Sequence, residues 1–177
     1  GFKELEGIHS RTDYDLSQHE KHSGKKLQYF DTELNESYVP YVVETSVGLD
    51  RLFLSILCGS FVEETVGDEQ RVLLKIPKHL APVNVAVLPL LKKDGLNDVA
   101  RAVFNDLKSN FTCHYEEKDS IGKRYRRQDA IGTPLCITID HDTIRDNQVT
   151  VRDRDTMKQE RVELRKLPVI IKEKLGI

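Results

Sequence analysis

The second half of the chain alternates between strand-like and helix-like segments, and this alternation restricts the fold more than any other feature of the sequence. Apolar or alternating runs with the length of strands occupy residues 83–88, 111–115, 135–139, 149–151 and 162–164. Helical patterns occupy residues 96–107, 122–130 and 167–175. We therefore predict an α/β fold in which residues 83–177 form a five-stranded mixed sheet with three helices.

The first half carries weaker signals. Residues 3–8 and 37–44 have the composition of strands, and Pro40 within the second indicates an edge or a bulge. From Ser46 onward the apolar residues recur at helical spacing through residue 57. This pattern predicts a strand that runs into a buried helix.

Two prolines, Pro77 and Pro82, separate the halves, so we place a domain boundary between residues 82 and 83. Residues 1–82 contain 9 Lys and Arg against 14 Asp and Glu, whereas residues 83–177 contain 18 against 15. The net charge of −2 therefore hides an acidic half and a basic half. Because nucleic-acid binding depends on local cation density, any such site is expected in the second half. Only that half has a complete alternation of strands and helices, so only that half is expected to fold by itself.

The sequence gives no sign of a membrane segment or a redox function. No stretch approaches the about 20 uninterrupted apolar residues of a membrane span, and the first residues lack the pattern of a signal peptide. We therefore expect a cytoplasmic protein. The cysteines Cys58, Cys113 and Cys136 are odd in number and lack metal-ligand spacing, so we interpret them as reduced thiols in the core.

The segment ETSVGLDR, residues 44–51, places a carboxylate, a hydroxyl, a glycine and an arginine where a strand passes into a helix. Such a junction can hold a charged ligand: a carboxylate pairs with an ammonium group, and an arginine can contact phosphate oxygens. A capped helix with a surface Asp–Arg pair explains the same residues. The residues alone leave both interpretations open.

The run KRYRR, residues 123–127, has four cations around Tyr125. On a helix Lys123 and Arg127 share a face, so the run is either an RNA-binding surface or a solvated helix face, while Tyr125 is expected to pack inward. Arg152 and Arg154 alternate with aspartates, which fits an ion-pair ladder as well as RNA contact. His19 and His22 lack an identifiable third metal ligand.

Three stretches together resemble the C-terminal part of class II glycyl-tRNA synthetases whose catalytic and anticodon-binding domains lie on one subunit. They are ELEGIHSRTDYDLSQHEKHSG at 4–24, YVPYVVETSVGLDRL at 38–52, and SIGKRYRRQDAIGTPLCITID with VTVRDRDTM at 120–140 and 149–157. The resemblance implies that residues 1–82 are the end of an antiparallel catalytic domain plus a linker, and that residues 83–177 are the anticodon-binding domain.

The resemblance also implies that residues 44–51 are the third class II motif. Arg51 would hold the γ-phosphate of ATP, Gly48 would lie against the nucleotide, and Glu4 would be a carboxylate associated with Mg²⁺. The implied ATP-binding residues are Glu4, Leu5, Gly48, Leu49, Asp50 and Arg51. ATP and Mg²⁺ are thus the expected substrate and cofactor.

A glycine pocket is implied at the same motif, with an acidic lining that receives the ammonium group. Its residues would be Glu44, Thr45, Ser46, Val47 and Gly48, and Glu44 and Arg51 are the two expected to take part in catalysis. Thr45 stands where many members of the family have proline, which bears on the shape of the loop more than on its chemistry.

The implied partner of the second half is tRNA(Gly), bound through Lys123, Arg124, Arg126 and Arg127, with the arginines Arg124 and Arg127 expected to matter more than Lys123. Family members form homodimers. The first and second class II motifs are absent and would precede Gly1, so we expect a fragment without synthetase activity by itself. The alternatives are a non-catalytic RNA-binding or polymerase-accessory relative, and an unrelated small-molecule enzyme.

Overall fold

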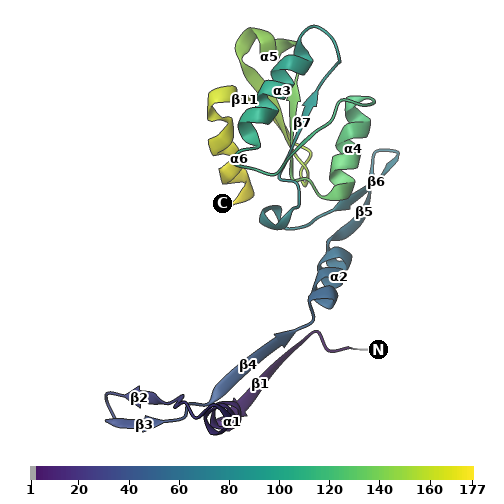
Figure 1. Cartoon of the computed structure of the whole chain (residues 1–177). Coiled ribbons are helices and arrows are strands. Elements are labelled where there is room, and N and C mark those ends of the chain that lie inside the picture. Colours follow the sequence, from purple (N-terminus) through teal and green to yellow (C-terminus); the bar gives the residue numbers. More distant parts are fainter. Residues whose placement is uncertain (1–2) are drawn as a thin grey trace. The chain divides into compact units, whose positions relative to one another are not determined.

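The computed structural model describes residues 3–177, which divide into two compact units, Gly1–Ser55 and Ile56–Ile177 (Figure 1). Within the described residues, no helix combines the length and the apolar character needed to cross a membrane. The predicted domain boundary between residues 82 and 83 falls inside the second unit. It states which part of the chain folds by itself, and it stays a prediction.

A five-stranded sheet forms the centre of the second unit, in the order β11-β10-β9-β7-β8. Its strands are β7 (Val85–Pro89), β8 (Cys113–Tyr115), β9 (Leu135–Ile139), β10 (Gln148–Asp153) and β11 (Gln159–Glu163). β7 is parallel to β8 and β9, whereas β10 is antiparallel to β9 and β11. The prediction of a five-stranded mixed sheet is confirmed.

The three predicted helices are present, together with a fourth that the sequence did not predict. They are α3 (Leu96–Leu107), α4 (Ile121–Ile131), α6 (Leu167–Leu175) and the additional α5 (His141–Asp146). Six residues are too few to show a helical period. The helix α5 instead begins at a capping box, in which the side chain of Asp140 accepts a hydrogen bond from the backbone N–H of Thr143 at 3.0 Å.

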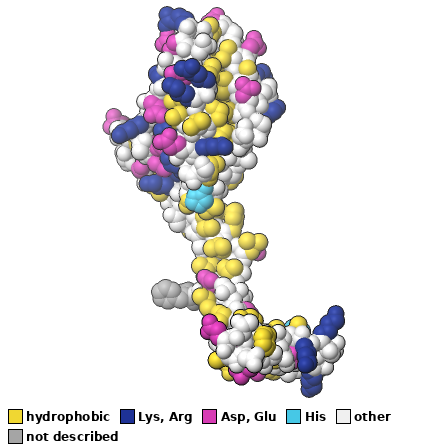
Figure 2. Space-filling model, turned by 90° about the vertical axis from the view of Figure 1, so that its left-hand side faces the viewer, with side chains coloured by type: hydrophobic (Ala, Val, Ile, Leu, Met, Phe, Trp, Pro, Cys, Tyr) yellow, Lys and Arg dark blue, Asp and Glu magenta, His cyan; other side chains and the backbone are white. Residues whose placement is uncertain are grey.

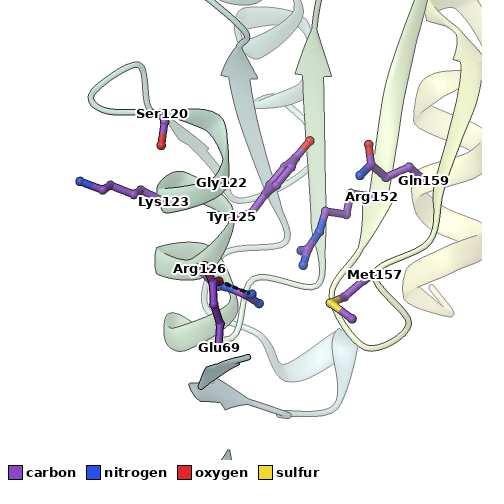
Figure 3. A pocket seen from close by; sticks show the side chains of 9 residues that line it. All are labelled: Glu69, Ser120, Gly122, Lys123, Tyr125, Arg126, Arg152, Met157 and Gln159. Atoms are coloured by element: carbon purple, nitrogen blue, oxygen red, sulfur yellow. Dashed lines mark hydrogen bonds and ion pairs between the residues drawn. The ribbon is translucent and has the colours of Figure 1, made fainter. Parts of the chain in front are cut away.

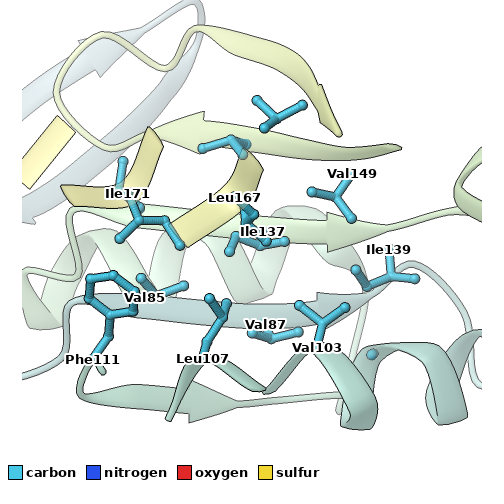
Figure 4. Close-up of a cluster of buried hydrophobic side chains, with 14 of the residues drawn as sticks. Val85, Val87, Val103, Leu107, Phe111, Ile137, Ile139, Val149, Leu167 and Ile171 are labelled. Atoms are coloured by element: carbon cyan, nitrogen blue, oxygen red, sulfur yellow. The ribbon is translucent and has the colours of Figure 1, made fainter. Parts of the chain in front are cut away.

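The two faces of this sheet bury different amounts of apolar surface. One face packs against α3 and α6 through a large cluster that includes Val85, Val87, Ile137, Val103 and Ile171 (Figure 4). On the other face, Ala86, Leu88 and Cys136 pack against Ile121 and Tyr125 of α4. The larger cluster is the main hydrophobic core, and the thinner side beneath α4 leaves room for polar chemistry.

Of the two cysteines in the sheet, Cys136 is buried and Cys113 is half-buried. Burial raises the pKa of Cys136 to about 12 and that of Cys113 to about 11, so both stay protonated near neutral pH. Cys58, in contrast, is exposed, so its predicted place in the core is wrong for this part of the chain.

A hairpin precedes the sheet and belongs to the second unit. Its strands, β5 (Phe61–Val66) and β6 (Glu69–Leu74), lie outside the predicted elements, and β6 packs against α4. Gly132 follows α4 with a φ of +86°, and a Cβ at this position would lie 3.0 Å from the carbonyl oxygen of Leu74. Glycine therefore permits the end of α4 to approach the hairpin closely.

The first unit contains an antiparallel pair, β1 (Glu6–Thr12) with β4 (Val42–Val47), and a small hairpin, β2 (Tyr29–Asp31) with β3 (Glu36–Tyr38). The predicted strand at 37–44 is broken in two, with Pro40 between β3 and β4. Helix α1 (Tyr14–Ser23) was not predicted, because it buries no residue and has no apolar stripe.

Helix α2 (Leu49–Ser60) begins in the first unit and ends in the second. The sequence predicts this helix to be buried, but Leu49 and Phe53 are 77% and 62% exposed, and Ser60 is its only buried residue. Hydrophobic side chains accordingly lie at the surface around α2 (Figure 2).

An ion pair ties the short 3₁₀ helix η1 (Lys78–Leu80) to β10. Lys78 Nζ lies 2.5 Å from Asp153 Oδ2, and Asp153 Oδ1 also accepts the backbone N–H of Thr156 at 2.9 Å. Burial alone would raise the pKa of Asp153, but Lys78 and Thr156 outweigh burial and lower it to about 2.

A pH dependence of stability follows from this ion pair. Because the folded pKa of Asp153 lies below the ordinary value of 3.8, its contribution of about 2 kcal/mol is complete above pH 4 and is lost as the pH falls through 2. Urea unfolding of the wild type and of Asp153→Asn at several pH values checks this. The difference between their free energies of unfolding should shrink toward pH 2. A difference that does not change with pH would contradict the prediction.

Candidate functional site

A groove of about 440 Å³ opens beside α4 in the second unit (Figure 3). Side chains from β6, α4, β10, the turn after β10 and β11 form its walls. The lining residues are Glu69, Ser120, Gly122, Lys123, Tyr125, Arg126, Arg152, Met157 and Gln159. The groove thus combines cations, an aromatic ring and hydrogen-bonding groups, a mixture suited to a single-stranded nucleic acid.

Two cations of the KRYRR run reach this groove. Lys123 is exposed and makes no ion pair among residues 3–177. Arg126 is about one-third exposed, and its Nη2 lies 3.1 Å from Glu69 Oε2 on the hairpin. Arg127 points elsewhere: it pairs with Glu116 and, at 2.9 Å, with Asp119, and the hydrogen bond to Glu116 raises the pKa of Arg127.

Arg124 is buried, with an exposure of 2%. Its Nη1 donates to the carbonyl oxygens of Pro89 at 2.6 Å and Glu116 at 3.2 Å, and its Nη2 donates to that of Leu90 at 3.1 Å. Burial lowers the pKa of Arg124. The structure thus corrects the expectation that Arg124 contributes more than Lys123 to a binding surface, because Arg124 joins the end of β7 to the start of α4.

Tyr125 packs inward, as the sequence predicts. Its hydroxyl lies 2.6 Å from Thr138 Oγ1, and the Arg152 guanidinium carbon lies 4.7 Å from the centre of its ring. The guanidinium therefore lies over the ring, and Tyr125 and Arg152 both line the groove.

The alternating arginines of β10 and the following turn are buried: Arg152 is 4% exposed and Arg154 is 2% exposed. Arg152 makes a two-pronged ion pair with Asp129, at 2.8 and 3.0 Å. Arg154 donates to the carbonyl oxygens of Leu74, Ile76 and Gly132. Both arginines thus have structural partners, a carboxylate for Arg152 and mainly backbone carbonyls for Arg154, and Arg152 alone also lines the groove.

The predicted nucleotide residues of the first unit line a second concavity, of about 640 Å³. Its lining residues are Glu4, Leu5, Ser46, Val47, Gly48, Leu49, Asp50 and Arg51. A side-chain nitrogen of Arg51 donates to the carbonyl oxygen of Glu4, and the backbone N–H of Gly48 donates to that of Leu5 at 3.3 Å. Residues more than 40 positions apart in sequence are thus brought to one place.

Glu44 and Thr45 do not line this concavity. Thr45 alternates with Ser46 along β4 and therefore points to the opposite face of the strand. Glu44 lies 3.4 Å from Arg11, an ion pair between two partly exposed side chains. Among residues 3–177 no group of three or more histidine, cysteine or carboxylate side chains is arranged to hold a metal ion.

The anticodon binding domain family model matches residues 84–174, just over half of the chain. The chain belongs to this family. Glycine-tRNA ligase from Chlorobaculum tepidum is 52% identical over 175 residues, which cover 99% of this chain and 37% of the relative. Those from Treponema denticola and Caldanaerobacter subterraneus are both 50% identical, over 92% and 99% of this chain. The chain spans less than two-fifths of the length of these curated relatives.

The groove lies almost wholly in the matched anticodon-binding domain. Of its nine lining residues, Glu69 alone falls outside residues 84–174. Sequence reasoning missed Glu69, and it also missed Asp129 as the partner of Arg152. No local pattern could have found either, because both act through partners more than 20 residues away.

Proposed function

We propose that this chain is the C-terminal portion of a cytoplasmic, homodimeric glycine-tRNA ligase and that its anticodon-binding domain binds the anticodon arm of tRNA(Gly). The observation that carries the proposal is the identity of about 50% to glycine-tRNA ligases along nearly the whole chain, joined to the family match at residues 84–174. The groove beside α4 supplies suitable chemistry for this partner.

The groove offers different contacts to the backbone and to the bases of an RNA strand. Lys123 carries the positive charge that a phosphate requires, whereas Arg126 is paired with Glu69 at 3.1 Å. Arg152 also lines the groove, but it is 4% exposed and paired with Asp129, so its guanidinium shapes the wall beside the Tyr125 ring and does not reach out to the RNA. Ser120 and Gln159 add side chains that donate and accept hydrogen bonds.

The concavity of the first unit would bind ATP. Arg51 supplies a cation for phosphate oxygens, Gly48 leaves space for the close approach of a ligand, and Leu5 adds an apolar side chain for the nucleoside. Glu4 and Asp50 fit the requirement of Mg²⁺ for one or two carboxylates plus substrate phosphates. When bound, Mg²⁺ would neutralise part of the phosphate charge.

In the proposed reaction the glycine carboxylate attacks the α-phosphorus of ATP, and the bond to pyrophosphate breaks. Glycyl-adenylate forms, and the glycyl group then moves to the terminal adenosine of the tRNA with release of AMP. In this chain Glu44 would attract the ammonium group of glycine, and Ser46 on the same face of β4 would border the pocket.

Replacement of Lys123 tests the RNA surface. Lys123→Gln should weaken binding of tRNA(Gly) about threefold to tenfold at 0.1 M salt and reduce the slope of log K against log salt concentration by about 1, because one phosphate contact is lost. Lys172→Gln, on α6 at the opposite face of the sheet, is the matched control and should change neither quantity. An unchanged affinity and slope for Lys123→Gln would place the RNA elsewhere.

A further inference from the structure

One wall of the groove beside α4, called the RNA groove below, comes from outside the matched domain. The β5–β6 hairpin places Glu69 at the groove, where it meets Arg126 at 3.1 Å. In the hairpin register Glu69, Arg71 and Leu73 share one face, and Arg71 and Leu73 are buried. The same face of the hairpin therefore both packs on α4 and reaches the groove.

A buried carboxylate holds this hairpin in place. Asp129 of α4 is fully buried, and its Oδ2 accepts a hydrogen bond from Arg71 Nε at 2.9 Å. Arg71 also pairs with Glu64 and donates to the carbonyl oxygen of Arg154. Burial alone would lower the pKa of Arg71, but these acidic partners outweigh burial and raise it.

The same carboxylate also fixes the arginine of the groove. Asp129 Oδ1 and Oδ2 accept the two terminal nitrogens of Arg152, at 2.8 and 3.0 Å, and this fork holds the guanidinium over Tyr125. Asp129 thus joins two arginines that lie 81 positions apart in sequence. One arginine belongs to the hairpin, and the other borders the groove.

We propose that Asp129 is a positioning residue that makes the β5–β6 hairpin a working part of the RNA site, through Arg71 on one side and Arg152 on the other. The hairpin then holds Glu69 beside Arg126, where its carboxylate opposes phosphate and favours a base that offers an amino group. This proposal rests on the proposed function. It assigns the choice among RNAs to a hairpin beyond residues 84–174.

Two variants of the whole chain test the proposal without removing Asp129. The probes are a tRNA(Gly) transcript and the same transcript with all three anticodon bases replaced. Glu69→Gln should lower the ratio of the two affinities about threefold, because Arg126 becomes available to any phosphate. Glu63→Gln is the matched control, since Glu63 lies on the opposite face of the hairpin and should leave the ratio unchanged.

Arg71→Lys tests the coupling itself. Lysine keeps the charge beside Asp129 but cannot also reach Glu64 and the carbonyl oxygen of Arg154, so amides of residues 61–74 should exchange hydrogen faster while those of β7 and β9 do not. The affinity ratio should again fall about threefold, and Glu69→Gln in this background should have little further effect, because the two changes act through one element. The salt slope should not decrease, unlike that of Lys123→Gln, because no phosphate contact is lost.

The outcomes separate this proposal from the proposed function. If Lys123→Gln weakens tRNA binding but Arg71→Lys leaves the affinity ratio or the hairpin exchange unchanged, the positioning role is wrong and the RNA groove stands. If the effects of Arg71→Lys and Glu69→Gln simply add, the coupling is wrong. If Lys123→Gln changes nothing, the groove does not bind tRNA and both proposals are overturned.

Discussion

Asp129→Ala is expected to lower the free energy of unfolding of the chain by about 3–5 kcal/mol, the cost of breaking a buried ion pair from one side. The carboxylate of Asp129 is fully buried between Arg71 and Arg152, which are 1% and 4% exposed. Without it Arg71 retains only Glu64 and a backbone carbonyl, and Arg152 is left without a carboxylate partner. Two positive charges then face each other away from water.

Urea unfolding followed by circular dichroism measures this loss. Glu173→Ala removes an exposed carboxylate on α6 and should change the unfolding free energy by no more than about 0.5 kcal/mol. A triple variant, Asp129→Leu with Arg71→Met and Arg152→Met, should lose less than Asp129→Ala, because the buried charges are removed together. A loss below about 1 kcal/mol for Asp129→Ala would contradict the assignment.

The sheet and its main helices were predictable because each strand or helix carries its own pattern. β7 and β9 are buried on both faces and appear as continuous or alternating apolar runs, and α3 places Leu96, Ala100, Val103 and Leu107 on one buried stripe. Helix α1 offers no such stripe and stayed hidden. The β5–β6 hairpin was also missed, because its buried face contains Arg71, and an arginine is expected at the surface when only the sequence is known.

The candidate sites differ in the same way. The resemblance brought Glu4 and Leu5 together with Gly48 and Arg51, and the structure places all four around one concavity. In the KRYRR run, by contrast, charge and helical period could not show that Arg124 is buried, because its carbonyl partners come from the end of β7 and the segment after β8. A cation counted from sequence is a binding residue only when tertiary structure leaves it exposed.

Arg51→Ala should produce the largest change in activity. In a glycine-tRNA ligase that contains this chain, we expect glycine-dependent exchange of pyrophosphate into ATP to fall about 10² to 10³-fold, the usual cost of removing one group that stabilises developing charge. Arg51 lies in the first turn of α2, and the carbonyl oxygen of Glu4 holds its guanidinium at the edge of the concavity. Its cation thus acts where the start of a helix already favours anions.

The binding of tRNA distinguishes a role in ATP binding from a general loss of structure. Arg51 belongs to the first unit and the groove beside α4 to the second, so Arg51→Ala should leave the affinity for tRNA(Gly) within about twofold, as expected for sites that share no contacts. Lys21→Ala, an exposed cation on α1, is the matched control for charge and should retain exchange activity. A phosphate contact lowers the barrier to adenylate formation without touching the anticodon arm. Arg51 would therefore not be that contact if Arg51→Ala kept its exchange activity, or if it lost tRNA affinity in parallel.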